Sequence, residues 1–320
     1  KENTIMKKIN TYLIPCYNCE KYIENTIKDL IETITVELIE YDYEIILVND
    51  SSKDNTISVI EKLVSSNPNI VLINFSKNFG QHSALMAGLR STNGDIIVCL
   101  DDDGQTAASE IKKIINKLDN EIDVVYAKYE EKKHSIFRNF GSKINNLMAV
   151  KLINKPKDLY ISSFFAMKKY IKDEVILYSN PYPYIIGLIL RTTDRITNVN
   201  VTHFERKIGK SNYNLKKLVS LLMNGFTNFS VKPLRIALVF SAMLTTSAFL
   251  LIIYFILNKI FNPNVPLGWT SMIIVTLVIG SILSFILGLI GEYVGRIYMS
   301  INNNPQYVIR SKIDDRKEKK

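Results

Sequence analysis

The chain has 320 residues, of which 47% are hydrophobic and 22% charged, and its formal net charge is +9. This length suits one large domain or two modest ones. Lysine and arginine flank apolar segments and form no single basic run, which fits an anionic membrane surface and argues against nucleic acid as the partner. The mean hydropathy of +0.06 is high for so charged a chain, and the apolar excess is concentrated near the C-terminus.

Apolar runs alternate with helical patterns through the first half of the chain. Short runs rich in β-branched residues predict strands, and the segments between them predict helices. The predicted strands are residues 11–14, 44–48, 70–75, 96–100 and 123–126, and the predicted helices are residues 19–39, 56–64, 79–89 and 109–118. This alternation is typical of a doubly wound, mostly parallel α/β sheet. No G-x-G-x-x-G or Walker A loop follows the first strand, so neither a dinucleotide fold nor a P-loop NTPase is supported.

Three consecutive carboxylates follow the fourth predicted strand. Side chains alternate along an extended segment, so Asp101 and Asp103 point one way and Asp102 points away. Ligands of open α/β sheets bind just beyond the carboxyl ends of the strands. Two carboxylates on one side predict a hard cation, Mg²⁺ or Mn²⁺, shared with substrate phosphates. The alternative is an Asp-rich turn that caps the next helix.

Two of the three cysteines, Cys16 and Cys19, form a C-x-x-C pair. Such a pair can indicate redox chemistry or half of a zinc site. A structural zinc site needs four ligands, and Cys99 is the only other cysteine. We therefore favour unpaired thiols of a cytosolic protein.

Four motifs of the first half resemble those of family-2 inverting glycosyltransferases with the GT-A fold. They are residues 15–18, 48–56, 78–80 and 100–105. The resemblance implies that Asp101 and Asp103, assisted by Gln105, bind the metal on a nucleotide-sugar diphosphate. The donor-binding residues that it implies are Pro15, Tyr17, Asn18, Asp50, Asn78, Gly80, Asp101 and Gln105. Cys19 stands where the family usually has Glu, and residues 49–51 read Asn-Asp-Ser in place of Asp-Asp-Gly, so the identity of the base stays open.

Two segments of the second half resemble polyprenyl-phosphate glycosyltransferases within that family. Residues 203–213 follow their His-x-x-Arg-x-x-Gly-x-Ser-x-Tyr pattern, and residues 137–142 match the same group. The resemblance implies Asp103, Arg206 and Arg138 as catalytic residues. The acceptor phosphate would be bound by Arg206, Ser211, Lys210 and His203. Taken alone, residues 203–213 are better interpreted as a solvated basic loop, and the motifs of the first half favour the functional interpretation. Phe165 stands where the group usually has Arg, which leaves the contacts to the donor sugar open.

The middle segment, residues 160–164, contains no carboxylate. A sugar hydroxyl needs a general base to become a nucleophile, whereas a phosphate monoester is already anionic. We therefore expect transfer from a nucleotide-sugar, UDP-linked by default, to polyprenyl (undecaprenyl) phosphate, giving a lipid-linked sugar for cell-surface glycans. The alternatives are a hydroxyl acceptor or an inactive membrane scaffold. A processive polysaccharide synthase is excluded, because its Gln-x-x-Arg-Trp motif cannot form around Trp269, the single tryptophan.

Two uncharged stretches near the C-terminus, residues 236–258 and 270–290, are each long enough to span a membrane. Basic residues outside them predict that both ends are cytoplasmic; the alternative is a buried helical hairpin. The expected organisation is a cytoplasmic GT-A domain (1–212), an amphipathic juxtamembrane helix (213–232), two transmembrane helices (233–292) with an external loop near 259–268, and a basic tail (293–320) whose charged end is disordered. We expect a multi-pass protein of the bacterial inner membrane and, by resemblance, a homo-oligomer, namely a tetramer.

Overall fold

The computed structural model describes residues 8–104, 108–129, 155–202, 268–301 and 304–316, with separate helical positions between 243 and 261. The chain divides into two compact units. Residues 1–218 and 304–320 form the first, called here the sheet unit, and residues 219–303 form the second. Each unit is described by itself.

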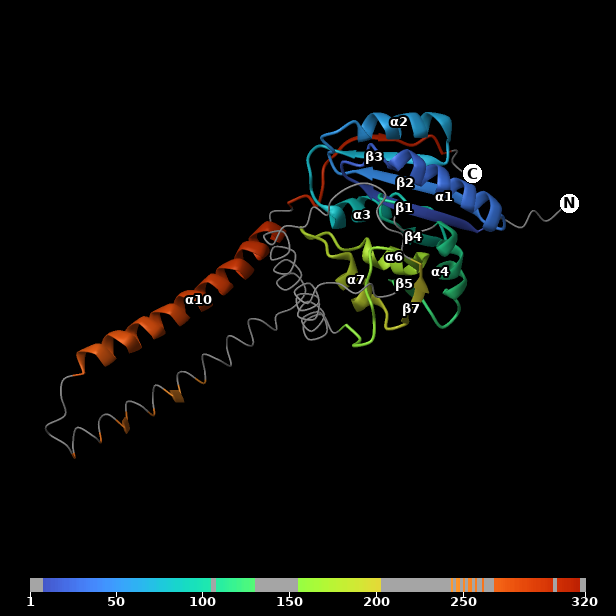
Figure 1. The fold of residues 1–320 in the computed structure, drawn as a ribbon. Coiled ribbons are helices and arrows are strands. Elements are labelled where there is room, and N and C mark those ends of the chain that lie inside the picture. The colour runs from blue at the N-terminus through green and yellow to red at the C-terminus, as the bar shows by residue number, and fades with distance from the viewer. Residues whose placement is uncertain are drawn as a thin grey trace. The chain divides into compact units, whose positions relative to one another are not determined.

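The described part of the sheet unit contains eight strands (Figure 1). They are β1 (Ile9–Cys16), β2 (Asp42–Asn49), β3 (Ile70–Phe75), β4 (Ile96–Cys99), β5 (Val124–Tyr129), β6 (Phe165–Lys168), β7 (Ile196–Val201) and β8 (Ile309–Ile313). The helices are α1 (Ile23–Glu37), α2 (Thr56–Ser66), α3 (Gln81–Leu89), the 3-10 turn η1 (Ala108–Glu110), α4 (Ile111–Lys117), α6 (Lys169–Val175) and α7 (Ile185–Thr192).

The strands form one mixed sheet in the order β7-β5-β6-β4-β1-β2-β3-β8. Strands β1 to β4 are parallel, and β5 and β7 run in the same direction, whereas β6 and β8 are antiparallel to their neighbours. The carboxyl ends of the parallel strands therefore share one edge, called here the carboxyl edge. The predicted α/β architecture is confirmed, with all five predicted strands and four predicted helices present, but β6 to β8, α6 and α7 were not predicted.

Helices cover both faces of the sheet because the parallel strands are apolar on both sides. Tyr12 and Ile14 of β1 belong to the cluster that packs against α1, α2 and α4. Leu13, which points the other way, lies against α3. A methyl group at Gly88 of α3 would stand 2.1 Å from Leu13 Cδ1, so glycine permits this close approach.

The C-terminal segment corrects part of the prediction that residues 312–320 are disordered, because Lys312 and Ile313 belong to β8; residues 317–320 lie outside the described residues. Strand β8 pairs antiparallel with β3, with Ser311 opposite Asn74. The Arg316 guanidinium then contacts the buried carboxylate of Glu44 and the carboxylate of Asp314. The sequence did not predict this strand because its composition is charged. The residues that stabilise it, in β3 and at Glu44, lie far away in sequence.

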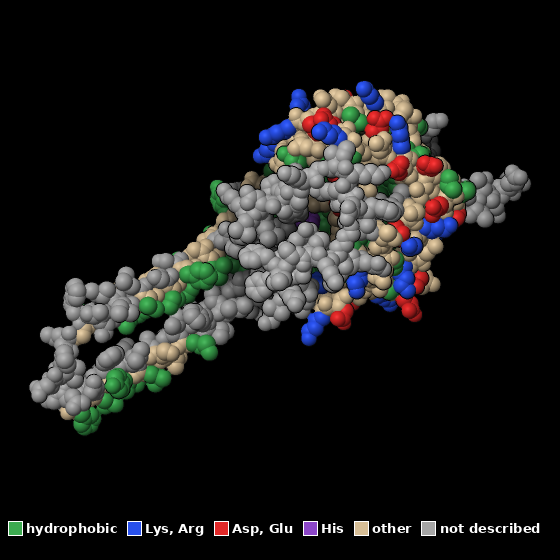
Figure 2. Space-filling model, viewed as in Figure 1, with side chains coloured by type: hydrophobic (Ala, Val, Ile, Leu, Met, Phe, Trp, Pro, Cys, Tyr) green, Lys and Arg blue, Asp and Glu red, His purple; other side chains and the backbone are tan. Residues whose placement is uncertain are grey.

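The second unit contains α10 (Trp269–Ile301). Residues Val278–Met299 have a mean hydropathy of 1.8 and no buried position, and this is the one stretch within the described residues that is long and apolar enough to cross a membrane. Figure 2 shows hydrophobic side chains along this helix. The helix extends beyond the predicted 270–290. The first predicted span lies outside the described residues except for the separate helical positions, so the two-helix hairpin is not confirmed.

We predict that Arg316→Ala lowers the free energy of unfolding of the sheet unit by about 2 kcal/mol, because it leaves the buried Glu44 without its cation. The hydrogen bond from Arg316 holds the pKa of Asp314 well below its usual value. A depressed carboxyl pKa contributes stability above the unfolded-state pKa, and that stability is lost as the pH falls through the folded-state value. The difference in unfolding free energy between the wild type and Arg316→Ala should therefore be smaller in acid than at pH 7.

The measurement is urea denaturation of the full chain in detergent at pH 7 and at pH 3. Arg310→Ala is the control, since Arg310 is an exposed arginine of the same strand. Equal stability of the two variants at pH 7 would contradict the assigned role of Arg316.

Candidate functional site

The loops that follow β1 and β2 are joined at the carboxyl edge. The backbone N–H of Asn18 donates to Ser52 Oγ at 3.0 Å, and Asn18 Oδ1 accepts from the N–H of Lys53 at 2.8 Å. Asn18 and Ser51 both adopt left-handed backbone conformations, with φ of 54° and 56°. The predicted donor-binding residues Asn18 and Asp50 are thereby held on neighbouring loops.

Asp50 connects the end of β2 to the loop before α3. Its two carboxylate oxygens accept the backbone N–H groups of Phe79 at 2.7 Å and Gly80 at 2.8 Å. Asn78 Nδ2 donates to the Asp50 carbonyl at 3.2 Å. Burial raises the pKa of Asp50 although both N–H bonds oppose the shift. A carboxylate has about four acceptor positions, so Asp50 can still accept a hydrogen bond from a ligand.

Asp101 stands directly beyond β4 and receives donors from two other elements. The Ser163 hydroxyl donates a short hydrogen bond to Asp101 Oδ2, and Gln81 Nε2 of α3 approaches Oδ1 at 3.4 Å. Ser163 comes from the middle segment, just before β6. The middle segment therefore presents a hydroxyl at this position, a contact that was not predicted.

Asp102 faces a different neighbour. Its carboxylate accepts the backbone N–H of Tyr17 at 3.1 Å. Burial, with the nearby charges of Asp101 and Asp103, raises the pKa of Asp102 to about 6. Asp102 is thus engaged by the loop after β1, whereas Asp101 is engaged by Ser163 and Gln81. Within the described ranges, no group of three or more His, Cys, Asp or Glu side chains could hold a metal, so a cation here would need further ligands from substrate, solvent or Gln105.

His82 is a residue near the site that sequence reasoning did not select. Its ring packs edge-on against Tyr184 with a centroid distance of 5.0 Å. Burial lowers its pKa to about 4, so the imidazole is neutral at pH 7. Its Nδ1 is buried without a hydrogen-bond partner among the described residues. The one sequence feature that could have indicated His82 was its place at the start of the helix that follows Gly80.

The three cysteines are buried free thiols. Cys19 is held by its own backbone, whose N–H donates to Thr56 Oγ1 at 2.8 Å. The C-x-x-C pair therefore lies in the packed base of the β1 and β2 loops.

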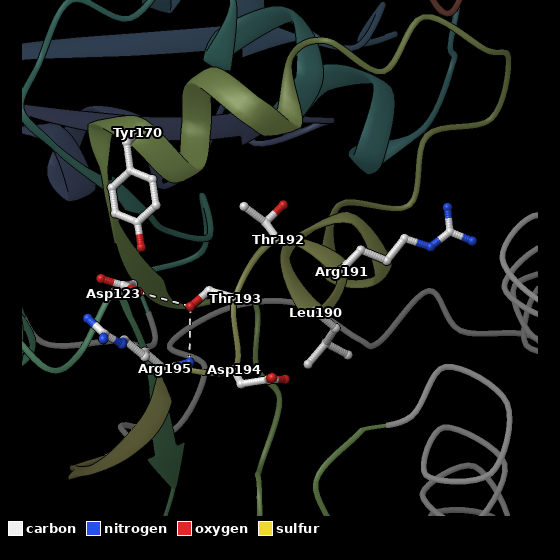
Figure 3. A pocket seen from close by; sticks show the side chains of 8 residues that line it. All are labelled: Asp123, Tyr170, Leu190, Arg191, Thr192, Thr193, Asp194 and Arg195. Carbon is white, nitrogen blue, oxygen red and sulfur yellow. Dashed lines mark hydrogen bonds between the residues drawn. The ribbon is translucent and has the colours of Figure 1, made fainter.

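A cavity of about 380 Å³ lies at the opposite edge of the sheet (Figure 3). It is lined by Asp123, Tyr170 and residues 190–195. Asp123 and Arg195 precede β5 and β7, which places the cavity at the amino ends of these strands. The Asp123 carboxylate is already bound by Lys168 Nζ and Thr193 Oγ1, each at 2.9 Å. None of the predicted site residues lines this cavity.

The structure brings one group of predicted site residues to the carboxyl edge and does not describe the other. The first group is Pro15, Tyr17, Asn18, Asp50, Asn78, Gly80, Asp101 and Asp103. The second group lies outside the described residues and comprises Gln105, Arg138, His203, Arg206, Lys210 and Ser211. The structure thus describes the positions of most predicted donor-binding residues, and the acceptor-binding residues remain a prediction from sequence.

Comparison with known proteins identifies relatives over nearly the whole chain. Residues 11–176 match the family described as glycosyl transferase family 2. The chain is 32% identical to the uncharacterized glycosyltransferase YkcC of Bacillus subtilis, over 93% of this chain and 92% of that protein. It is 30% identical to the undecaprenyl-phosphate 4-deoxy-4-formamido-L-arabinose transferase of Proteus mirabilis, over 98% and 97% of the two chains. The enzyme of that name from Photorhabdus laumondii is 31% identical over 98% of this chain and 96% of its own.

Among solved structures, the fold is similar to that of glucosyl-3-phosphoglycerate synthase from Mycobacterium tuberculosis. The TM-score is 0.50 at 20% identity, covering 68% of this chain and 76% of the synthase. That synthase was crystallised with Mn²⁺, UDP-glucose and phosphoglyceric acid. The likeness supports the GT-A-like α/β architecture of the sheet unit.

We predict that Gly80→Ala disrupts the connection between β2 and α3. Gly80 has φ of 90° and ψ of 160°, a region that is essentially restricted to glycine and costs other residues about 1–3 kcal/mol. A methyl group there would meet nothing within 4 Å, so the cost is one of backbone conformation. The backbone N–H groups that bind Asp50 should become less protected.

Hydrogen exchange at the amides of residues 79 and 80, with an unfolding curve, measures both effects. Lys77→Ala, an exposed change in the same loop, is the control. Unchanged protection at residue 79 in Gly80→Ala would show that the Asp50 connection does not require this backbone conformation.

Proposed function

The chain belongs to glycosyl transferase family 2, and from that premise we propose that it transfers a sugar from a nucleotide-sugar donor to undecaprenyl phosphate. The product would be a lipid-phosphate-sugar used in assembling or modifying cell-surface glycans. That the protein is a glycosyltransferase follows from the family and from relatives named as undecaprenyl-phosphate sugar transferases.

The observation that carries the acceptor proposal is the group that the middle segment presents to Asp101. It is the hydroxyl of Ser163, and residues 160–164 contain no carboxylate. A hydroxyl acceptor would need a base at this point, whereas a phosphate monoester attacks without losing a proton. The relatives named for undecaprenyl phosphate support the same choice.

The donor would lie across the carboxyl edge. Asp50, Pro15 and Tyr17 would hold the base and ribose, and the loop formed by Asn78 and Gly80 would close around them. The N-terminus of α3 begins beside Asp101, and the partial positive charge of a helix N-terminus favours an anionic diphosphate. Asn18, which joins the first two loops, would keep this pocket in shape.

The residues at the end of β4 suit a divalent cation that is shared with the donor. Asp101 and Asp103 would hold Mg²⁺ or Mn²⁺ with Gln105, and the diphosphate and water would complete the coordination. When bound, the ion would supply Lewis-acid stabilisation of the departing diphosphate. The mycobacterial synthase binds Mn²⁺ and UDP-glucose; for this chain, the metal proposal rests on the carboxylate pair, and UDP remains the default donor.

The acceptor phosphate would be bound by cationic and polar side chains of the second half. Arginine binds phosphate with two parallel hydrogen bonds, a role that we assign to Arg206 and Arg138. Lys210, Ser211 and His203 would complete this set. In the reaction, a phosphate oxygen would bond to the anomeric carbon from the face opposite the diphosphate. The bond to the nucleotide diphosphate would break, with inversion and with no proton transfer.

We further propose that the protein is anchored in the bacterial inner membrane with its catalytic unit in the cytoplasm. Helix α10 supports this, because it contains one stretch able to cross a bilayer. A second span over residues 236–258, the juxtamembrane helix and the tetramer are parts of the same proposal. Reaction of Asn264→Cys with an impermeant thiol reagent in intact cells tests the external loop, and protection of this cysteine would refute the two-span arrangement.

We predict that chelation abolishes transfer and that Mg²⁺ or Mn²⁺ restores it. Asp103→Asn should lower turnover by at least about 100-fold, because a carboxylate ligand of the ion is lost. Asp102→Asn should keep the metal dependence, since Asp102 accepts the backbone N–H of Tyr17. The measurement is a cation titration of turnover for both variants. Full turnover in excess EDTA would contradict the metal proposal.

We predict that Arg206→Ala lowers transfer to undecaprenyl phosphate by about tenfold or more, because a charge-assisted phosphate contact is lost. Donor binding should change much less, since Asp50 and Asp101 are intact. A donor-binding titration and a lipid-transfer assay on the same variant separate the two effects. Arg191→Ala, at the opposite edge of the sheet, is the control. Equal loss in both assays, or efficient transfer to a sugar alcohol by the wild type, would show that the acceptor is wrongly assigned.

A further inference from the structure

Three segments distant in sequence meet beside the carboxyl end of β3. They are residues 75–80, residues 176–184 between α6 and α7, and residues 304–310, which lead from α10 into β8. The Val308 carbonyl accepts the backbone N–H of Ser76 at 2.9 Å. The buried amide of Gln306 donates to the carbonyls of Tyr178 at 2.9 Å and Asn180 at 2.7 Å. These contacts attach residues 304–310 to the loop between α6 and α7.

This junction exposes apolar side chains that the fold does not bury. Leu177 is 72% exposed, the most of any large hydrophobic side chain described in the sheet unit, and Tyr182 and Val308 are 49% and 43% exposed. Lys77 and Arg310 are exposed nearby in the same segments. The three segments contain no Asp or Glu. The only charged side chains within the three segments are thus cationic, which suits an anionic surface, and the exposed Asp173 and Glu174 lie on α6 before the second segment.

The loop presents these side chains from a restrained backbone. Tyr182 adopts φ of 57°, which is unusual for a bulky residue and persists where the surroundings enforce it. Pro181 and Pro183 flank it and fix their own φ angles. Side chains held in this way lose little conformational freedom when they bind.

The covalent chain limits how far this surface can lie from α10. Gln306 follows Ile301, the last helical residue of α10, by five residues. Five residues extend over at most about 17 Å. If α10 crosses the bilayer, as the proposed function requires, the chain that leaves the helix therefore reaches Gln306 within this length.

We propose that Leu177, Tyr182 and Val308 form a second contact with the bilayer, separate from the membrane-spanning segment. Their apolar side chains enter the boundary between headgroups and acyl chains, and Lys77 and Arg310 contact anionic headgroups. The contact bears on catalysis through Tyr184, which belongs to the same loop and packs on His82 beside the candidate site. The bilayer contact would hold the carboxyl edge at the depth of the lipid phosphate groups.

A label at position 177 tests the contact directly. The full chain carrying Leu177→Cys, labelled with an environment-sensitive fluorophore, is placed in nanodiscs that contain phosphatidylglycerol. The native cysteines are buried, so the introduced one takes the label. The control is Val36→Cys, on α1 and 65% exposed. We expect quenching by headgroup-level spin-labelled lipid at least about threefold stronger at 177 than at 36.

The two labels also decide between a lipid and a protein partner. Equal quenching at 177 and 36 would overturn the proposal. A label at 177 that is shielded from water but insensitive to the spin-labelled lipid would indicate a second copy of the chain, and would overturn it equally.

A charge at the same position tests the consequence for transfer. Leu177→Asp should lower transfer to undecaprenyl phosphate in nanodiscs by about three- to tenfold, because an apolar side chain is withdrawn from the interface. Transfer to a short-chain soluble acceptor in detergent, and nucleotide binding, should stay unchanged. Val36→Asp is the matched control and should resemble the wild type in every assay.

The outcomes separate this inference from the proposed function on which it rests. A wild type that transfers to no polyprenyl phosphate would refute the proposed function, while lipid quenching at position 177 would still establish the contact. A wild type that transfers normally, with unimpaired Leu177→Asp and no selective quenching, would overturn the contact alone.

Discussion

The candidate site depends on the carboxylate of Asp50. This buried group directly follows β2, and it accepts the backbone N–H groups of Phe79 and Gly80. The parallel strands β2 and β3 are thereby connected beyond the last of their paired residues. Because Gly80 is also the residue from which α3 begins, the same contact sets where the N-terminus of α3 points. The geometry of the candidate site therefore relies on a hydrogen-bonded turn.

The second constraint is the crowding of negative charge after β4. Three successive carboxylates would repel one another on a single side, and in the turn after β4 the first two are bound by different neighbours. Asp102 turns to the backbone N–H of Tyr17, and Asp101 turns to Ser163 and Gln81. Burial keeps the pKa of Asp102 near 6, so its charge costs free energy, which donors around it only partly offset. The arrangement leaves a concentrated negative field that a divalent cation would neutralise.

The sequence predicted the first half of the fold well, because strands β1 to β5 are continuous apolar runs and the helices between them have clear faces. It also predicted that residues 50, 101 and 103 share an edge, since parallel strands end together. It failed for β6, β7 and β8. Strand β8 has three polar residues between its two terminal isoleucines, and its partner β3 lies more than 230 positions away. The contacts of Ser163 and His82 were missed for a related reason. They depend on how the middle segment and α7 fold back over the sheet, which local periodicity cannot encode.

The position of β8 in the chain has a consequence for biogenesis. The edge strand of the sheet unit is encoded after α10, so the ribosome has already made the apolar helix before the sheet can be completed. Until then, β3 exposes a row of unpaired backbone groups of the kind that promotes aggregation, and Glu44 lacks Arg316. Completion of the sheet unit thus follows synthesis of the helix, and a nascent chain that stalls within α10 carries an open sheet edge that chaperones and proteases can recognise.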